Sequence, residues 1–353
     1  MTVARTAGPR RFERGWSREA SPFHSGEQQV QSRVGVRAQV ERAGRNMIRT
    51  HLPDLFREFF EALPLLVVGS VDADGRLWAS LLSGEPGFIR SPTAETLHVE
   101  ACPALGDPLA DQLALGSPLG LLGIELATRR RNRANGRIVA RNADSFSVHV
   151  EQSFGNCRQY IQAREPTFDA GLRALAGPPR AEGALLSAHS RELLERSDTL
   201  FIATASAAAK RGGDGEGVDV SHRGGRPGFV RVDTTQDGTR LTIPDFSGNF
   251  MFNTLGNLEV NPHSGIVCPV FATGDVLSVT GTAHVVWDGP ELAAFDGAQR
   301  LLVFHIASGV VLERALPLRF DGLNPSPHLL ETGTWAEAEQ RARELRAVAK
   351  PPQ

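Results

Sequence analysis

The chain of 353 residues has few cysteines and no long apolar run. Its three cysteines, Cys102, Cys157 and Cys268, are far apart and form neither a CxxC pair nor a zinc-type spacing. Scattered thiols in odd number argue against a disulfide framework, so we expect a cytoplasmic protein. No apolar run reaches the length that spans a bilayer. Arg10 and Arg11 precede no apolar stretch, so we expect neither a secretory nor a twin-arginine signal.

Lysine is almost absent, and the charge is nearly balanced. Lys210 and Lys350 stand among basic residues that are otherwise arginines, and the formal net charge at pH 7 is −2. Such a balance predicts no general attraction to nucleic acid or to a membrane surface. Arginine binds phosphate and carboxylate groups better than lysine does, but a codon bias is the explanation that we prefer. The length predicts about two domains.

Several common catalytic motifs are also missing. The sequence has no Walker motif and no GxGxxG after a strand. Ser153 and Ser221 lack the surroundings of a hydrolase nucleophile elbow. The histidines are dispersed, and none forms a pair at metal-binding spacing. Hydrolase, P-loop and metal-centred functions are therefore disfavoured.

The sequence does contain a long internal repeat. Pro-Gly-Phe-Ile-Arg at 86–90 returns as Pro-Gly-Phe-Val-Arg at 227–231, an offset of 227 − 86 = 141. Later segments stay in register while the offset grows to 145, as between Gly136 and Gly281. Loop insertions produce such a drift between two copies of one fold, and the period is far too long for a solenoid. We therefore expect two similar β-rich domains.

Apolar and turn patterns predict the elements of each copy. Short apolar runs between turn residues predict strands at 65–69, 77–82, near 97, 118–126, 137–140 and 145–151, and then at 199–205, 217–221, 228–232, 240–243, 265–271, 276–287 and 301–314. Helices are expected at 26–48, 54–63, from 107 onward, and at 157–164, 187–196, 250–260 and 335–348. Six or more short antiparallel strands per copy favour a small closed barrel over an open sheet.

The fold class that follows is mainly β with peripheral helices (α+β). We expect a loosely ordered tail over residues 1–24, a first domain over 25–170, a second over 180–325 and a helical C-terminal tail over 326–353. Residues 176–179, Ala-Gly-Pro-Pro, are typical of a linker.

Two polar stretches of the second copy form the candidate site. Residues 219–231 end one strand and begin the next, and residues 244–257 run from a strand into a helix. Ser, Gly, Asn and Thr at such a turn present hydroxyls and backbone N–H groups at a helix start, which is a ready anion site. Arg223 and Arg231 would add charge for a phosphate. By spacing alone, a capped helix with solvated arginines explains the same residues.

These stretches resemble the flavin-nucleotide-binding proteins related to pyridoxamine 5′-phosphate oxidase, which share the FMN-binding split β-barrel. Asp-Val-Ser-His-Arg-Gly-Gly at 219–225, residues 227–231 and residues 244–257 carry the resemblance, with 123–133 and 153–161 in the first copy. It covers roughly residues 50 to 320. It implies two tandem split β-barrel domains, FMN in a groove between paired barrels, and a homodimer.

The resemblance also implies which residues bind the cofactor. The phosphate would be held by Arg231, Ser247, Asn249, Asn253 and Thr254. Elsewhere in the site, Arg223 and His222 would face the ring or a substrate, Thr280 and Gly281 would lie on a strand near the flavin, and Ser221 and Phe246 complete the set. Asn253 and Thr254 stand where the oxidase has an Arg-Lys pair in its phosphate loop. The oxidase's substrate-binding Arg-His segment has no clear counterpart after Arg319. Oxidation of pyridoxamine phosphate is therefore not expected.

Two features admit alternative interpretations. The arginine-rich run at 129–133 is either a solvated hairpin edge, which we prefer slightly, or a cradle for the flavin phosphate or a nucleotide that reaches across the barrel interface. The second copy is the expected ligand site, because the first copy has Ala-Cys-Pro-Ala at 101–104 in place of the polar turn. A nucleic-acid role is disfavoured, since acidic residues interrupt any basic face.

The functional hypothesis is an FMN-dependent oxidoreductase that acts on a small-molecule substrate and receives electrons from an external donor. The protein would orient and tune the flavin, and the flavin would carry out the redox step. A flavin- or nucleotide-binding carrier or sensor without turnover is the alternative, and haem or a deazaflavin is the alternative ligand.

Overall fold

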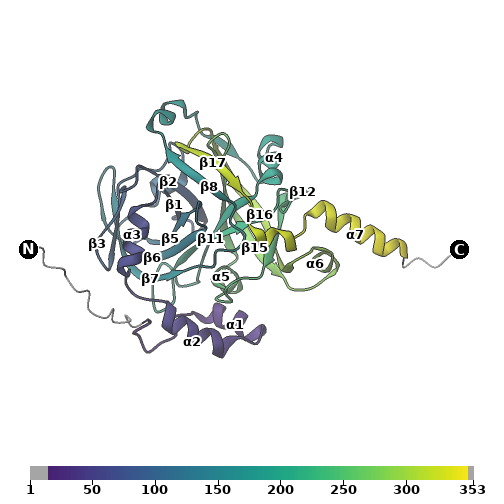
Figure 1. The fold of residues 1–353 in the computed structure, drawn as a ribbon, viewed down its shortest axis with the longest axis horizontal. Helices are drawn as coiled ribbons and strands as arrows, with labels where there is room; N and C mark the ends of the chain where they lie inside the picture. The colour runs from purple at the N-terminus through teal and green to yellow at the C-terminus, as the bar shows by residue number, and fades with distance from the viewer. Residues whose placement is uncertain (1–14, 349–353) are drawn as a thin grey trace, which may run out of the picture.

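Two antiparallel sheets with the same strand order form the body of the molecule (Figure 1). The structure is a computed structural model and describes residues 15–348. The first sheet has the order β2-β1-β5-β6-β7-β4-β3, and the second has β11-β10-β14-β15-β16-β13-β12, with β9 beside β16. The first-sheet strands are β1 Leu65–Val71, β2 Leu77–Ser83, β3 Ile89–Thr93, β4 Thr96–Val99, β5 Pro118–Glu125, β6 Arg130–Arg141 and β7 Phe146–Gly155. The second-sheet strands are β9 Arg180–Glu182, β10 Thr199–Ala205, β11 Val218–Gly224, β12 Arg231–Thr235, β13 Gly238–Phe246, β14 His263–Val270, β15 Asp275–Val286 and β16 Ala298–Leu312.

The two sheets also share their pairing register. β1 pairs with β2, and β10 with β11, over seven residues each. Gly120 of β5 faces Asn135 of β6, just as Gly265 of β14 faces Thr280 of β15. The first of two irregularities in the β6–β7 ladder follows Asn135, and the bulge in the β15–β16 ladder follows Thr280. Each strand of the first sheet therefore has a positional counterpart in the second.

Neither sheet closes into a barrel within the described residues. The first sheet ends at β2 and β3, and the second ends at β11 and β12. The expected closed barrels are thus corrected to open, curved sheets, whereas the predicted antiparallel pairing is confirmed. The edge strands β2 and β11 contact β14 and β5 of the opposite half. A covered edge needs no closure to be protected from unwanted pairing.

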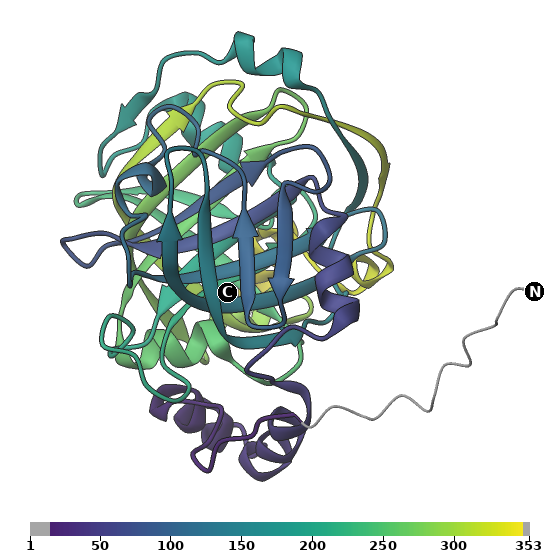
Figure 2. The same cartoon turned by 90° about the vertical axis from the view of Figure 1, so that its left-hand side faces the viewer.

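Each half has its own hydrophobic core, and a third cluster joins the halves. Leu66 and Val68 of β1 lie in the first core, and Ile202 of β10 lies in the second. Val67 and Phe201 lie between them in the joining cluster. Successive side chains of a strand point to opposite faces, so β1 and β10 each contribute to one core and to the interface. Figure 2 looks onto the first half, whose blue strands curve across the front of the molecule.

Two glycines allow this close approach. Gly120 packs against the backbone of β11, where a Cβ atom would lie 2.6 Å from the carbonyl oxygen of Val218. Gly265 packs against the backbone of β2, where a Cβ atom would lie 2.4 Å from the carbonyl oxygen of Leu77. The two contacts interchange when the halves are exchanged, so the halves are related by a local two-fold arrangement.

The helices lie outside the sheets (Figure 1). They are α1 Ser25–Arg33, α2 Arg37–Met47, α3 Asp54–Glu61, α4 Ala188–Arg196, α5 Asn253–Val260, α6 Pro290–Ala294 and α7 Trp335–Val348, with 3₁₀ turns η1 Pro108–Asp111, η2 Ala170–Leu175 and η3 Pro327–Glu331. The helices predicted at 54–63, 187–196 and 335–348 are confirmed. The single helix predicted at 26–48 is two helices, with a break at Gly35, whose φ is +75°.

The helix predicted at 157–164 is wrong. Residues 157–162 are irregular, and Ala163 begins strand β8 (Ala163–Phe168), which pairs with β17 (Leu318–Asn324). This pairing joins the end of one expected domain to the end of the other, and such a distant partner leaves no signal in a local window.

The N-terminal segment is packed from about its fifteenth residue onward. Trp16 and Phe23 are buried with Val40 and Ile48, so the expected loose tail does not extend through residue 24. The arginines at positions 10 and 11 lie outside the described residues. Among residues 15–348, no helix combines the length and the apolar character needed to cross a membrane.

Candidate functional site

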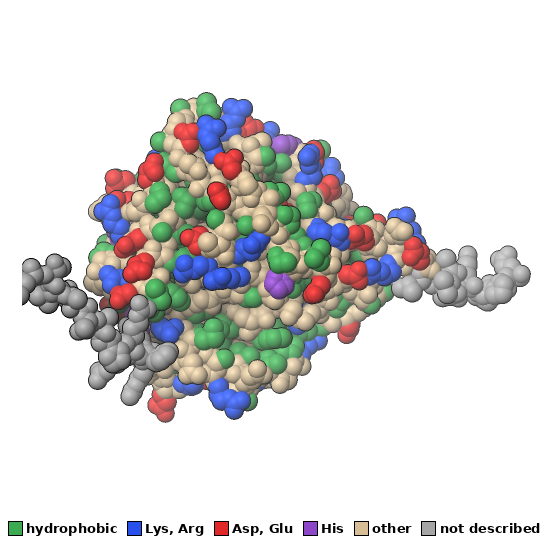
Figure 3. Space-filling view, in the orientation of Figure 1, with side chains coloured by type: hydrophobic (Ala, Val, Ile, Leu, Met, Phe, Trp, Pro, Cys, Tyr) green, Lys and Arg blue, Asp and Glu red, His purple; other side chains and the backbone are tan. Residues whose placement is uncertain are grey.

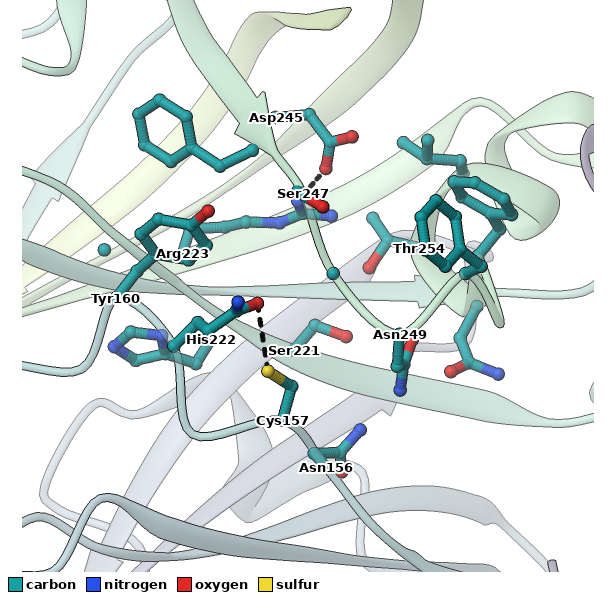
Figure 4. A pocket seen from close by; sticks show the side chains of 18 of the residues that line it. Asn156, Cys157, Tyr160, Ser221, His222, Arg223, Asp245, Ser247, Asn249 and Thr254 are labelled. Carbon is teal, nitrogen blue, oxygen red and sulfur yellow. Dashed lines mark hydrogen bonds and ion pairs between the residues drawn. The ribbon is translucent and has the colours of Figure 1, made fainter. Parts of the chain in front are cut away.

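A cavity of about 130 Å³ opens where the two halves meet (Figure 4). The first half contributes β5, β6 and the loop after β7, and the second half contributes β11, the end of β13, the start of α5 and β16. The lining residues are Leu122, Arg131, Arg133, Asn156, Cys157, Gln159, Tyr160, Ser221, His222, Arg223, Gly224, Pro244, Asp245, Phe246, Ser247, Gly248, Asn249, Phe250, Phe252, Asn253, Thr254, Leu255 and Arg300.

Four arginines and a single aspartate line the cavity. The aspartate, Asp245, is the penultimate residue of β13 and forms ion pairs with both Arg223 and Arg300. The Nε atom of Arg300 lies 2.8 Å from Oδ2 of Asp245. Figure 4 shows Arg223 directed at Asp245. On the outer face in Figure 3, by contrast, basic and acidic side chains are interspersed. Positive charge is thus concentrated in the cavity, which favours an anionic ligand.

Arg133 joins the halves through a buried polar network. Its guanidinium donates to Asp219 Oδ1 at 2.8 Å and to Ser221 Oγ at 2.6 Å. Asn135 and Asn257 also donate to the Asp219 carboxylate, at 2.7 and 2.9 Å. A buried charge is tolerated when it is paired and hydrogen-bonded, so this network fixes β6 of one half against β11 and α5 of the other.

Arg131 has no acidic partner among the described residues. Its Nε donates to the carbonyl oxygen of Cys157 at 2.6 Å. Its terminal nitrogens make no hydrogen bond within residues 15–348, and the residue lines the cavity. Burial, together with the cations of Arg133 and Arg223, lowers the pKa of Arg131 to about 10. The side chain is therefore still a cation at neutral pH, and its charge is available to a ligand.

Further donors come from the turn before α5. Phe250 and Phe252 have φ values of 59° and 62°, a left-handed conformation that is unusual for bulky residues. This turn places the hydroxyls of Ser247 and Thr254 at the cavity, and within the described part of the chain neither hydroxyl has a hydrogen-bond partner. The first N–H groups of α5 lie beside them, and a helix start favours an anion.

An aromatic wall lies on another side of the cavity. Tyr160, with a φ of 61°, places its ring 5.0 Å from the ring of Phe246. His222 is buried, and its Nε2 atom has no hydrogen bond among the described residues. Burial and the neighbouring arginine cations lower the pKa of His222 well below its usual value. The imidazole is therefore neutral at neutral pH.

Most of the predicted cofactor residues meet at this cavity. Ser221, His222, Arg223, Phe246, Ser247, Asn249, Asn253 and Thr254 line it. Arg231 does not: its guanidinium pairs with Asp233 and Glu291 and lies 4.1 Å from the centre of the Trp335 ring. We remove Arg231 from the candidate site, because β12 is the far edge of its sheet.

Thr280 and Gly281 are also absent from the cavity wall. They lie on β15, in the positions that Asn135 and Gly136 occupy on β6. The cavity wall includes β6 of the first half and does not include its counterpart β15. The expectation assigned the strand to the wrong half, because the sequence does not show how the halves are paired.

The arginine-rich run at 129–133 is not a solvated edge throughout. Arg131 and Arg133 line the cavity, whereas Arg130 lies 3.9 Å from Glu125 at the surface. Arg129 donates to the carbonyl oxygen of Asn324. Arg131 and Arg133 are two residues apart on β6, and successive side chains of a strand point to opposite faces. This alternation could have indicated that the two arginines share one face of the strand. Asn156, Cys157 and Tyr160 also line the cavity; they lie in a segment that the resemblance includes but for which it implied no roles.

Comparison with known proteins gives loose matches. No family model and no curated protein matches this chain. HupZ of Group A Streptococcus is 14% identical over 35% of this chain and 90% of its own, with a TM-score of 0.27. A candidate pyridoxamine 5′-phosphate oxidase of Lactobacillus delbrueckii is 15% identical, and the match covers 37% of this chain and 98% of that protein, with a TM-score of 0.28. HutZ, a heme storage protein of Vibrio cholerae, is 19% identical, and the match covers 42% of this chain and 99% of HutZ, with a TM-score of 0.21. These likenesses do not identify the ligand of the cavity.

Proposed function

We propose that the cavity binds FMN and that the protein is an FMN-dependent oxidoreductase of the group related to pyridoxamine 5′-phosphate oxidase. One observation carries the proposal: unpaired donors from both halves converge on one basic cavity. They are the terminal nitrogens of Arg131, the hydroxyls of Ser247 and Thr254, and the first N–H groups of α5. A phosphate monoester carries up to two negative charges and accepts several such hydrogen bonds.

The residues present fit the two ends of FMN. The donors at the start of α5 and Arg131 would hold the phosphate. Tyr160 and Phe246 offer an apolar wall for the ring. When bound, the flavin supplies electron and hydride transfer. The chain's own part is to orient the ring, to exclude water and to balance the phosphate charge.

The cavity is complete within one chain, because both halves line it. We therefore infer that the halves, residues 25–170 and 180–325, are two copies of one split-barrel unit that pair with each other. A homodimer remains a prediction, but this cavity does not require a second copy.

A carrier or sensor is the second candidate. Asp245 is the single carboxylate among the lining residues, and two arginines neutralise it. His222 is buried and neutral at neutral pH. Neither group is poised as a proton donor and acceptor at neutral pH, and this favours binding without turnover.

The first experiment identifies the small molecule. Protein purified without added cofactor is denatured, and the released compound is identified by mass and absorption spectrum. FMN in near-stoichiometric amount is expected. A haem spectrum, a deazaflavin, or a failure of apoprotein to bind added FMN would refute the proposed ligand.

The second experiment separates an oxidoreductase from a carrier. The FMN complex is mixed with NADH or NADPH without oxygen, and bleaching of the flavin absorption is followed. An oxidoreductase is expected to be reduced and then reoxidised by a defined acceptor over many cycles. A flavin that stays oxidised with both donors would favour the carrier.

A further inference from the structure

Helix α1 lies against α5, the helix whose start lines the cavity (Figure 1). The two helices touch through their backbones: a Cβ atom on Gly26 would lie 2.0 Å from the carbonyl oxygen of Gly256. Glu27 and Gln31 follow at helical spacing on this side of α1, and both are buried. Side chains of α1 therefore reach the segment that precedes α5.

Gln31 and Glu27 hold the two ends of the strained turn. Gln31 Nε2 donates to the carbonyl oxygen of Met251 at 3.0 Å. Asn253 Nδ2 donates to Glu27 Oε1 at 2.5 Å. Phe252, with its left-handed backbone, lies between these two anchors. Bulky residues keep such a conformation only where the surrounding structure enforces it, and α1 supplies that enforcement from outside the sheet.

We propose that α1 braces the ligand cavity, and that Gln31 and Glu27 are positioning residues that keep the turn before α5 in its ligand-binding geometry. The effect on the ligand rests on the proposed function. The effect on the turn does not, because it follows from contacts within the chain.

The charge of Glu27 also affects the anion site at the start of α5. The side chain faces His24 on its own element, Asp219 of β11, Arg133 of β6 and Asn253 of α5. Burial, reinforced by the Asp219 carboxylate, raises the pKa of Glu27 well above its usual value. Burial also lowers the pKa of His24. The buried carboxyl therefore favours its neutral form. Its ionisation would place a negative charge beside the helix start that receives the anion.

The first test compares two glutamines of α1. Gln31→Ala removes the anchor on Met251, and Gln29→Ala changes the same residue type at an exposed position of the same helix. FMN affinity is measured by quenching of flavin fluorescence. Gln31→Ala also removes the acceptor of Arg37 Nη1, at 3.2 Å. Loss of the hydrogen bond to Met251 predicts roughly 2- to 10-fold weaker binding for Gln31→Ala, and Gln29→Ala is expected to match the wild type. Equal affinity in the two variants would overturn the brace.

The second test uses the proton. Glu27→Gln keeps an oxygen that can accept from Asn253 but does not ionise. Ionisation of Glu27 is expected to lower the FMN affinity of the wild type as the pH rises. Glu27→Gln is expected to lack this part of the pH dependence. A purely structural role for Glu27 would give two parallel profiles, and that result would refute the charge dependence.

A third measurement keeps the brace testable without FMN. If wild-type protein binds no FMN, the proposed function fails, and amide hydrogen exchange over residues 250–256 then decides the structural claim. Faster exchange in Gln31→Ala than in Gln29→Ala supports the brace. Equal exchange in both variants rejects it.

Discussion

The two halves have matching backbones but very different side chains where they meet. Arg131 and Arg133 of β6 occupy the positions that Val276 and Ser278 occupy on β15. Arg223 of β11 corresponds to Leu82 of β2. The same strand order and register thus build a basic cavity on one side of the interface and an apolar region on the other. The comparison shows that side chains on a common frame, and not the frame itself, create the candidate site.

The apolar region opposite the cavity is covered by the segment that connects the two halves. Gly106 packs against Pro179 of the connecting segment and against Leu312. Gly177 donates from its backbone N–H to the carbonyl oxygen of Glu313 at 3.0 Å, and β9 continues the cover beside β16. The segment between the halves therefore closes the apolar side, while the basic side stays open.

The largest expected effect concerns the ion pair that has no equivalent in the other half. Asp219 stands at the position of Trp78 and neutralises the buried Arg133. Asp219→Ala leaves that guanidinium buried and unpaired, which is expected to cost about 3–5 kcal/mol of the free energy of unfolding. Chemical denaturation of the wild type and of Asp219→Ala measures this loss of unfolding free energy. Asp214→Ala, at a surface pair with Arg18, is the control. A loss as small as the control's would mean that the network does not hold the halves together.

The next prediction concerns Asp107 at the start of η1, on the apolar side of the interface that the connecting segment covers. Asp107, the N-cap of η1, accepts hydrogen bonds from Ser80 and Leu109. Burial nevertheless raises its pKa to about 6. Because the folded-state pKa lies above the unfolded one, this stability contribution is complete below about pH 4 and is lost as the pH rises through about 6.

Asp107→Asn tests this pH dependence. The shift corresponds to about 3 kcal/mol between the acidic and neutral ends. Wild-type stability is expected to fall by about that amount relative to Asp107→Asn when urea denaturation is repeated from about pH 4 to about pH 7. Two profiles that stay parallel would show that the cap hydrogen bonds outweigh burial.

The third prediction compares neighbouring arginines of β6. Arg131→Ala removes the unpaired cation of the cavity and is expected to weaken FMN binding about 10- to 100-fold, the usual value of a hydrogen bond to a charged group. Arg130→Ala changes a partly exposed side chain that lies outside the cavity wall and is expected to leave FMN affinity unchanged. Fluorescence titration measures both. Similar losses of FMN affinity in both variants would indicate that the arginines act through the general positive potential of the cavity. Arg131 would then not contact the phosphate directly.

The sequence was informative where the signal is local or repeated. The repeat at residues 86–90 and 227–231 predicted two similar β-rich halves, and the two sheets have the same strand order. The polar turn at 244–257 led to most of the second-half lining residues. Both signals are carried by neighbouring residues. The strands and the helix at Asp54–Glu61 likewise follow from short periodic patterns.

The sequence was uninformative where distant segments meet. Arg131 contributes to the site because β6 crosses to the opposite half, and nothing near it indicates that partner. Thr280 was assigned to the site for the same reason, since its strand has the right pattern in the wrong half. Closed barrels were expected because the cover supplied by the second half to β2 and β11 cannot be read from strand spacing.

The smallest expected effect tests the symmetry of the interface itself. Gly120→Ala and Gly265→Ala each place a Cβ atom against backbone of the opposite half, 2.6 and 2.4 Å from a carbonyl oxygen. Backbone cannot rotate away as a flexible side chain can, so each variant is expected to lose about 1–3 kcal/mol of unfolding free energy. The two losses should be nearly equal, because the contacts interchange when the halves are exchanged. Denaturant titration of both variants checks this. A marked inequality would mean that the frame, as well as the side chains, has diverged between the halves.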